Sequence, residues 1–288
     1  MKKTVLGHHG NGRTHWVGDG FPVRSLFSYH EHGAAVSPFL LLDFVGPHFF
    51  EPSTGRRGVG QHPHRGFETV SIVFDGEVEH RDSAGHGGVI GPGDVQWMTA
   101  GAGIVHEEYH SPAFVKGGGR MNMVQLWVNL PAADKMARPA YQSIVAAEIP
   151  VVELRNGAGL IRIIAGEFDG FRGPARTFTP INVWDLRLED GKSAVLSLPE
   201  GHTTMVVVIE GRVTVDGTQI GSAEIGMLSR QGSDVTLQAD GATTLLLLSG
   251  APIDEPIAGY GPFVMNSAED IRQAIADFNS GRFVAAGA

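Results

Sequence analysis

Apolar and polar positions divide the chain into many short strand-like runs separated by glycine-rich turns. Residues 39–45 form a continuous apolar run of the kind that a buried strand shows, and Pro47 ends it. Residues 69–74 alternate, the Asp75-Gly76 dipeptide follows, and residues 77–80 continue the β-type pattern, which predicts a hairpin. Further strands in the first half are expected over residues 95–99 and 121–130.

The second half of the chain repeats this style. Residues 203–209 form an apolar strand, the Glu210-Gly211 dipeptide turns the chain, and residues 212–215 alternate, which echoes the segment around Asp75-Gly76. The other strand-like runs there are residues 158–165, 180–188, 193–198, 235–238 and 243–248. Many short strands joined by glycine turns are typical of sandwiches and barrels. Two such series predict a duplicated β-barrel.

One helix is predicted near the C-terminus. Ser267 is placed as its N-cap, and Glu269 and Asp270 lie in the first turn, where the helix dipole favours negative charge. Gly281 stands where a glycine commonly ends a helix. The apolar positions with helical spacing between these ends are Ile271, Ala274, Ile275 and Phe278.

Composition limits the class of protein. At 288 residues and 42% hydrophobic content the chain can build one large or two ordinary domains, and its 40 glycines favour turns and short strands over helix. A net charge of −9 argues against a nucleic-acid surface, and a chain without cysteine has no disulfide framework or thiol chemistry. With no signal-peptide pattern and no apolar run of membrane-spanning length, we expect a cytoplasmic protein that does not enter a membrane.

Histidines are concentrated in the first part of the chain. Of 13 histidines only His202 lies beyond His110, so histidine chemistry is assigned to the first barrel. Most of these residues, such as His8, His9 and His15, are expected to be ordinary surface side chains.

Two pairs of potential metal ligands stand out, His62 with His64 and His106 with Glu108. Side chains at positions i and i+2 of a strand point to the same face, so each pair can aim two ligands at one point. If the two strands adjoin, three imidazoles and one carboxylate converge. This donor set suits iron, zinc, manganese, copper or nickel, and four ligands can leave an open position, as catalytic metal sites do.

Three segments around these pairs closely resemble the pirin family of the cupin superfamily. They are HPHRGFETV at residues 62–70, PGDVQWMTAG at residues 92–101 and GIVHEE at residues 103–108. The resemblance continues through residues 126–130 and 261–266 and covers essentially the whole chain. It implies an all-β bicupin fold, with two cupin barrels and a C-terminal α-helix.

The resemblance also implies a division of labour between the barrels. The metal-binding cupin is expected over residues 1–134, and a metal-free cupin with the C-terminal helix over residues 135–288. One divalent metal ion per chain is implied, with Fe(II) favoured and zinc, manganese, copper and nickel as alternatives. Its implied ligands are His62, His64, His106 and Glu108.

Other residues near these motifs are expected to have supporting roles or none at the metal site. Glu68 is expected to support a ligand or its strand, with direct ligation as the alternative, and Glu107 should face away from Glu108 by strand parity. Some further side chains could line the pocket, although ordinary surface or core roles are the more common ones for them. They are His80, His86, His110, Trp97, Met98, Met121, Met123, Trp127, Arg56 and Arg57.

The resemblance implies quercetin 2,3-dioxygenase activity, which opens the heterocycle of a flavonol with O₂ and releases carbon monoxide. Glu108 is then a candidate base as well as a ligand, because it can accept the proton of the flavonol hydroxyl. The alternative is a non-catalytic, iron-dependent, redox-sensing regulator that binds protein partners in transcription or metabolism. A third hypothesis is an oxygenase whose natural substrate is a different small aromatic molecule. Direct nucleic-acid binding is not expected.

Overall fold

The computed structural model describes residues 1–10 and 12–284, and β-strands make up most of its elements. The chain forms two compact units. The first barrel comprises Arg13–Gly33, Phe39–Ala146 and Ile253–Ala288, and the second barrel comprises Met1–Gly12, Ala34–Pro38 and Ala147–Pro252. These units are interleaved along the sequence, and the domain limits at residues 134 and 135 stay a prediction.

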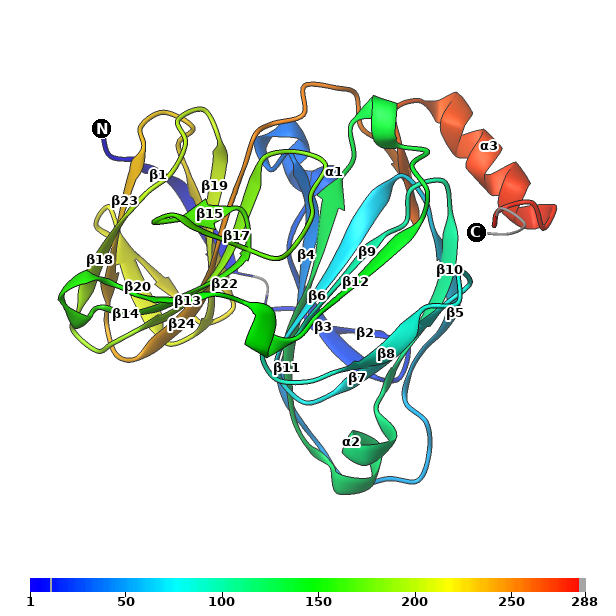
Figure 1. Ribbon diagram of the computed structural model, residues 1–288, viewed down its shortest axis with the longest axis horizontal. Coiled ribbons are helices and arrows are strands. Elements are labelled where there is room, and N and C mark those ends of the chain that lie inside the picture. The colour runs from blue at the N-terminus through cyan, green and yellow to red at the C-terminus, as the bar shows by residue number, and fades with distance from the viewer. Residues whose placement is uncertain (11, 285–288) are drawn as a thin grey trace. The chain divides into compact units, whose positions relative to one another are not determined.

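The first barrel is built from two sheets (Figure 1). Its seven-stranded sheet has the order β12 (Ala140–Ile144), β9 (Val95–Thr99), β6 (Phe67–Asp75), β11 (Gly119–Asn129), β4 (Phe39–Phe50), β3 (Phe21–Ser28), β2 (His15–Val17). Its four-stranded sheet has the order β5 (Gly58–His64), β10 (Ile104–His110), β7 (Val78–Asp82), β8 (Gly87–Ile90).

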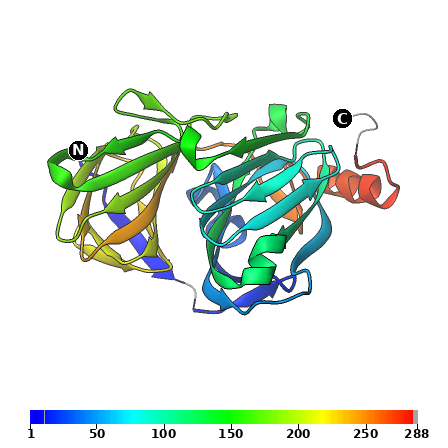
Figure 2. The same ribbon diagram turned by 60° about the horizontal axis from the view of Figure 1, so that its bottom comes forward.

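The second barrel repeats this topology and has its own apolar core. Figure 2 shows its strands curving into a barrel. Its seven-stranded sheet has the order β1 (Val5–Gly10), β22 (Glu224–Leu228), β19 (Thr203–Glu210), β24 (Thr243–Gly250), β17 (Ile181–Leu188), β14 (Gly159–Ala165), β13 (Val151–Glu153). Its four-stranded sheet has the order β18 (Ser193–Ser197), β23 (Asp234–Ala239), β20 (Arg212–Val215), β21 (Thr218–Gly221). Strands β18 and β23 therefore occupy the places that β5 and β10 hold in the first barrel.

The remaining elements are short, apart from one helix. Two-stranded sheets join β15 (Glu167–Phe168) with β16 (Phe171–Arg172) and β25 (Ala258–Tyr260) with β26 (Phe263–Met265). The α-helices are α1 (Tyr29–His32), α2 (Pro112–Gly117) and α3 (Ala268–Asn279), and the 3₁₀ turns are Gly33–Ala35, Ala132–Asp134, Ala146–Glu148 and Arg155–Gly157. Among the described residues, no helix has the length and apolarity needed to cross a membrane.

The predicted strands are present, but Pro47 does not end the first one. Strand β4 continues through Pro47 to Phe50, because a register shift in its pairing with β11 accommodates the proline. The predicted hairpin at Asp75-Gly76 is also wrong. Strand β6 pairs with β9 and β11, whereas β7 pairs with β8 and β10, so the chain passes from one sheet to the other at this turn. The Asp-Gly dipeptide supplies the bend, with Gly76 at φ +91°. Local sequence can mark a turn, but partner choice depends on which sheet buries the next apolar face. The Glu210-Gly211 turn makes the same passage from β19 to β20.

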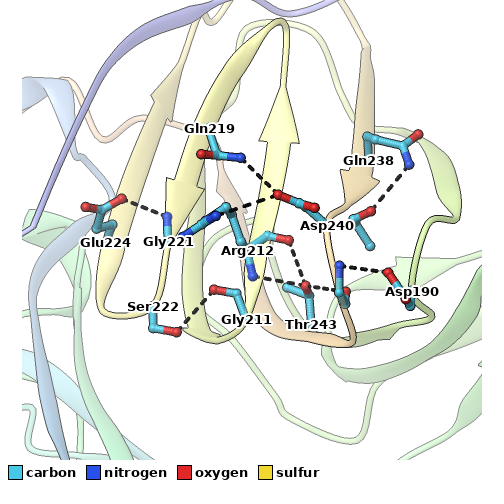
Figure 3. A network of polar contacts seen from close by, with 12 residues as sticks. Asp190, Gly211, Arg212, Gln219, Gly221, Ser222, Glu224, Gln238, Asp240 and Thr243 are labelled. Carbon is cyan, nitrogen blue, oxygen red and sulfur yellow. Dashed lines mark hydrogen bonds and ion pairs between the residues drawn. The ribbon is translucent and has the colours of Figure 1, made fainter.

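Polar contacts fix that second passage (Figure 3). The Thr243 hydroxyl donates to the carbonyl oxygen of Arg212 at 2.7 Å and accepts from the Arg212 amide at 3.1 Å. The Ser222 hydroxyl donates to the carbonyl oxygen of Gly211 at 3.1 Å. These bonds satisfy backbone groups that lose ladder partners where the chain leaves one sheet for the other.

The predicted C-terminal helix is confirmed as α3. The Ser267 hydroxyl caps it by accepting from the Asp270 amide, and Gly281 follows the helix at φ +73°. Its buried face, which includes Ile271 and Ala274, packs with Phe263 and Met265 of β26 in a cluster of the first barrel. Figure 1 shows α3 on the side of the first barrel that carries β5 and β10, and Val105 of β10 packs against the same cluster.

Candidate metal centre

Strands β5 and β10 bring three of the predicted ligands together. The two strands are antiparallel neighbours, and His62 lies directly opposite His106. The His106 ring lies 4.2 Å from the His62 ring and 4.8 Å from the His64 ring, measured between centroids. One potential ligand atom from each of the three histidines lies within 4.8 Å of the others. The prediction that His62 and His64 share a face is thus confirmed.

Glu108 lies on the same face of β10 as His106, where burial alternates along the strand. It forms a second group within 4.8 Å with His106 and His80, rather than one group with all three other predicted ligands. The Gln125 amide donates to Oε2 of Glu108 at 3.4 Å. Glu107 faces the other way, as parity predicts, and pairs with Arg56 at 3.2 Å.

The chemistry of these donors fits a divalent metal ion. Nδ1 of His64 and Nε2 of His106 are buried and have no hydrogen-bond partner among the described residues. Burial is the main cause that lowers the pKa of both imidazoles well below the usual range, so both are neutral near pH 7. Nδ1 of His62 lies 2.8 Å from the carbonyl oxygen of Gly60, which leaves Nε2 free to bind. Metal binding requires neutral imidazoles with lone pairs available.

His80 is a member of the site that sequence reasoning treated as a side issue. It is fully buried, and its Nδ1 lies 3.3 Å from Nδ1 of His106 and 2.9 Å from the amide nitrogen of Gln96. Its Nε2 lies 3.6 Å from Oδ2 of Asp82. An imidazole that contacts a metal-binding histidine, and is itself contacted by a carboxylate, commonly serves to orient that histidine. Alternation along β7 carried this signal, because His80 and Asp82 share a face.

Glu68 does not join the cluster. It is buried on β6, and its Oε1 accepts a hydrogen bond from the Thr99 hydroxyl at 2.8 Å rather than from an imidazole. Burial raises its pKa to about 7. Neither group of potential ligand atoms includes it. The structure thus gives no support to direct ligation by Glu68.

A cavity of about 430 Å³ opens beside the cluster and is walled by His62, His64 and Glu108. Its other wall comes from alternate residues of three neighbouring strands of the seven-stranded sheet. These are Phe21, Val23 and Ser25 of β3, Leu41, Asp43 and Val45 of β4, and Met123, Gln125 and Trp127 of β11. Ligand pockets in proteins typically occupy about 300–1,000 Å³ and are mostly apolar with a few polar groups. This cavity has both properties.

The remaining candidates divide between the cavity wall and the core. Met123 and Trp127 line the cavity, whereas Trp97, Met98 and Met121 are buried and do not line it. The aromatic ring of Trp127 lies 5.4 Å from that of His64. His15, expected to be an ordinary surface residue, lines the cavity.

The other histidines and arginines serve elsewhere. Nε2 of His110 lies 2.8 Å from the carbonyl oxygen of Gly20, and Nδ1 of His86 lies 3.4 Å from Asp82. Arg56 stacks over the Tyr109 ring at 3.4 Å, and Arg57 lies 5.7 Å over the Phe50 ring. None of these four side chains lines the cavity beside the cluster.

Buried contacts fix the backbone that follows His64. Nζ of Lys135 donates to the carbonyl oxygens of Gly66 and Val264, at 2.8 and 2.9 Å, and to Oδ1 of Asn129 at 2.6 Å. The Arg65 guanidinium binds Asp277 of α3 at 2.8 Å. A ligand strand held at its end keeps its imidazole in one position, which a metal site requires.

The equivalent strands of the second barrel have a different content. Strands β18 and β23 direct Ala194, Leu196, Val235 and Leu237 into an apolar core. Their register places Ala194 opposite Leu237 and Leu196 opposite Val235, whereas His62 lies opposite His106 in the first barrel. The duplication therefore preserves the fold and differs in the chemistry of these two strands.

Comparison with known proteins agrees with the fold. Residues 20–128 match the pirin family, and residues 183–284 match the pirin C-terminal cupin domain. A Pseudomonas aeruginosa protein that carries the provisional name quercetin 2,3-dioxygenase is 58% identical over 286 residues, covering 99% of this chain and all of the relative. Both barrels are thus cupin-type, and the predicted bicupin fold is confirmed.

Solved structures extend this likeness to the whole chain. A crystal structure of quercetin 2,3-dioxygenase from Acinetobacter baumannii has a TM-score of 0.96 and 53% identity, covering 98% of this chain and 99% of that one. A bacterial pirin from Escherichia coli, crystallised in complex with nickel(II), has a TM-score of 0.62 and 20% identity, covering 86% of this chain and 96% of its own. That second likeness is one of fold. The first relative's identity over nearly its full length and the two matching domains lead to one conclusion: the chain belongs to the pirin family.

Proposed function

We propose that this pirin is a metal-dependent dioxygenase that cleaves flavonols with O₂ in the manner of quercetin 2,3-dioxygenase. The proposed ligands are His62, His64, His106 and Glu108, and the proposed metal is Fe(II). When bound, the metal supplies the Lewis acidity that lowers the pKa of a substrate hydroxyl and the redox chemistry for O₂.

The cavity of about 430 Å³ is the observation that carries the proposal. It adjoins three of the proposed ligands, so a small molecule in it can reach the cluster. Trp127 and Met123 give it flat and adaptable apolar walls, which suit an aromatic substrate and exclude water. A regulator that only senses metal charge needs no such space beside its ligands.

Glu108 is the proposed base. Its carboxylate lies among the imidazoles, and the Gln125 amide holds Oε2 at 3.4 Å, so the other oxygen can accept a proton from the substrate hydroxyl. The names of relatives favour the same activity, since proteins from Pseudomonas aeruginosa and Acinetobacter baumannii carry the name quercetin 2,3-dioxygenase.

The test is oxygen consumption by the Fe(II)-reconstituted protein with quercetin, beside a Glu108→Ala variant. We expect oxygen uptake that follows flavonol loss, releases carbon monoxide and disappears in the variant. Metal content is measured in both proteins, because Glu108→Ala can lose metal as well as its base.

A protein with bound metal and no uptake above background would contradict the proposal. The non-catalytic, iron-dependent regulator would then be the better hypothesis, with protein partners as its ligands. Uptake with quercetin that is slow beside uptake with another small aromatic compound would support the dioxygenase and change its substrate.

A further inference from the structure

An acidic side chain lies within the apolar wall of the cavity. Asp43 is the one charged residue in the run from Phe39 to Val45, and it is half-buried. Leu41 and Val45, two residues away on either side, line the cavity on the same face of β4. A carboxylate among apolar neighbours is costly to bury without a partner, so an acidic residue at this position indicates a specific role.

Asp43 belongs to a polar row that crosses three strands. Ser25 of β3 and Gln125 of β11 are its direct neighbours in the two ladders. The row above it, Val23, Val45 and Met123, is apolar and also faces the cavity. The polar groups are therefore concentrated in one row of an otherwise apolar cavity wall.

The row connects the wall to the proposed metal ligands. Gln125 donates to Glu108 at 3.4 Å, so the near end of the row touches the cluster. Neighbouring strands are about 5 Å apart, so Asp43 and Ser25 lie one and two strands farther from the cluster than Gln125. A ligand with one end at the cluster can place its other end against Asp43.

Local contacts hold the Asp43 carboxylate in position. The Ser25 hydroxyl donates to Oδ1 at 2.6 Å, and His15, which also lines the cavity, interacts favourably with the carboxylate. Burial raises the pKa of Asp43, while Ser25 and His15 lower it. No described residue donates a hydrogen bond to Oδ2, so that oxygen can receive a donor from a ligand.

We propose that Asp43, positioned by Ser25, binds a hydroxyl group at the far end of an aromatic substrate whose near end reaches the His/Glu cluster. This assignment rests on the proposed function, because it takes the cluster to hold the substrate's near end. It narrows the substrate class to flat aromatic compounds with a metal-binding oxygen pair at one end and a phenolic hydroxyl at the other. Sites built to bind a hydroxyl discriminate strongly against analogues that lack it.

The test compares two flavonols that share the chelating 3-hydroxy-4-keto group. Quercetin carries phenolic hydroxyls on its outer rings, and 3-hydroxyflavone carries none. Binding is measured by fluorescence titration with the Zn(II)-loaded protein, because zinc is redox-inert and no turnover intervenes. In the wild type we expect quercetin to bind more tightly, and in Asp43→Leu we expect this preference to fall about 10-fold or more, as for a hydrogen bond to a charged group.

Two further variants separate the polar effect from shape. Asp43→Asn keeps the size and one oxygen acceptor but removes the charge, so its preference should lie between those of the wild type and Asp43→Leu. Val45→Ala enlarges the cavity at the same wall without removing a polar group, so it should change the affinities for quercetin and for 3-hydroxyflavone by a similar factor. Zinc content and thermal unfolding temperature are checked for every variant, and Asp43→Asn decides the matter if Asp43→Leu does not fold.

An unchanged quercetin preference in Asp43→Asn and Asp43→Leu would overturn the assignment, as would failure of both flavonols to bind the wild type. Failure of the Asp43 assignment can be distinguished from failure of the proposed function. A wild type that consumes oxygen with quercetin while the Asp43 variants keep the preference retains the dioxygenase and loses this subsite. A wild type that shows the Asp43-dependent preference but no oxygen uptake retains the subsite and loses the dioxygenase.

Discussion

Nδ1 of His106 lies 3.3 Å from Nδ1 of His80, so one buried imidazole backs another that is a proposed metal ligand. The Gln96 amide donates to the same nitrogen of His80 at 2.9 Å, which makes that nitrogen an acceptor. The hydrogen between the two rings then belongs to His106, and Nε2 of His106 keeps its lone pair. Asp82 completes the arrangement at Nε2 of His80, 3.6 Å away.

His80→Leu should therefore weaken metal binding without removing the site. Outer contacts of this kind typically contribute 10- to 100-fold to metal affinity, so we expect a loss of about that size with one metal still bound at saturation. Competition with a chromophoric chelator measures it. His86→Leu is the matched control, because His86 lies at the exposed end beyond Asp82 and should have little effect. Loss of all binding in His80→Leu would instead mark His80 as a ligand.

His106→Ala should lose metal and activity together. The variant removes one of the three imidazoles whose nitrogens lie within 4.8 Å of each other, and a site with fewer donors binds more weakly. Metal per chain is measured by elemental analysis after Fe(II) loading and desalting. His202→Ala in the second barrel is the control and should retain one metal per chain. Full metal content in His106→Ala would refute the ligand assignment, and a drop in His202→Ala would implicate the second barrel.

Glu68 should make the metal-free protein less stable as the pH rises. Its pKa in the folded protein is about 7, against an ordinary value of 4.5, so between these values the folded state holds more protons than the unfolded state. Stability from this group is unaffected below pH 4.5, falls through the interval and is lower by ~3 kcal/mol above pH 7.

Glu68→Gln is the variant that isolates this effect. The amide stays neutral and keeps an oxygen for the Thr99 hydroxyl. Urea unfolding of both proteins from pH 4.5 to pH 8 should show the variant gaining relative stability as pH rises. Taking the difference cancels the titration of the histidines common to both proteins. A constant difference across this range would mean that Glu68 is not held neutral by burial.

The sequence was sufficient for the ligand strands because period-two alternation is a local rule. His62 and His64 on one strand, and His106 and Glu108 on another, needed only parity to be placed on shared faces. The helix at Ala268–Asn279 was equally accessible, since its cap and apolar stripe lie within one segment. Local patterns therefore predicted the elements and two halves of the cluster.

The pairing partner of each strand and the contacts of buried polar residues could not be predicted from local sequence in the same way. The turn at Gly76 looked like a hairpin, but β6 and β7 belong to different sheets, because pairing depends on strands far along the chain. His80 and Asp43 gained their roles from neighbours on other strands, His106 and Ser25. The available signal was the polar residue itself: a lone carboxylate in the apolar run at residues 39–45 marks a position that the core alone does not explain.

Gly66 offers a test of how closely the backbone after His64 is fixed. It has φ +87°, and a Cβ there would lie 2.1 Å from the carbonyl oxygen of Val264. Gly66→Ala thus adds a steric clash to backbone strain. The Lys135 ammonium binds the carbonyl oxygens of both Gly66 and Val264, so it resists any shift that would relieve the clash. We expect a loss of about 1–3 kcal/mol in unfolding free energy from strain alone and more from the clash.

Gly85→Ala is the matched control for this substitution. Gly85 has φ +88°, but no atom lies within 4 Å of its ideal Cβ, so it reports strain without the clash. Urea unfolding should therefore show a larger loss for Gly66→Ala than for Gly85→Ala. Metal affinity should fall in Gly66→Ala alone, because movement of the backbone beyond Arg65 displaces the His64 ring. Equal stability losses with unchanged metal affinity would mean that β5 tolerates movement at its end, and that the contacts of Lys135 do not hold His64 in place.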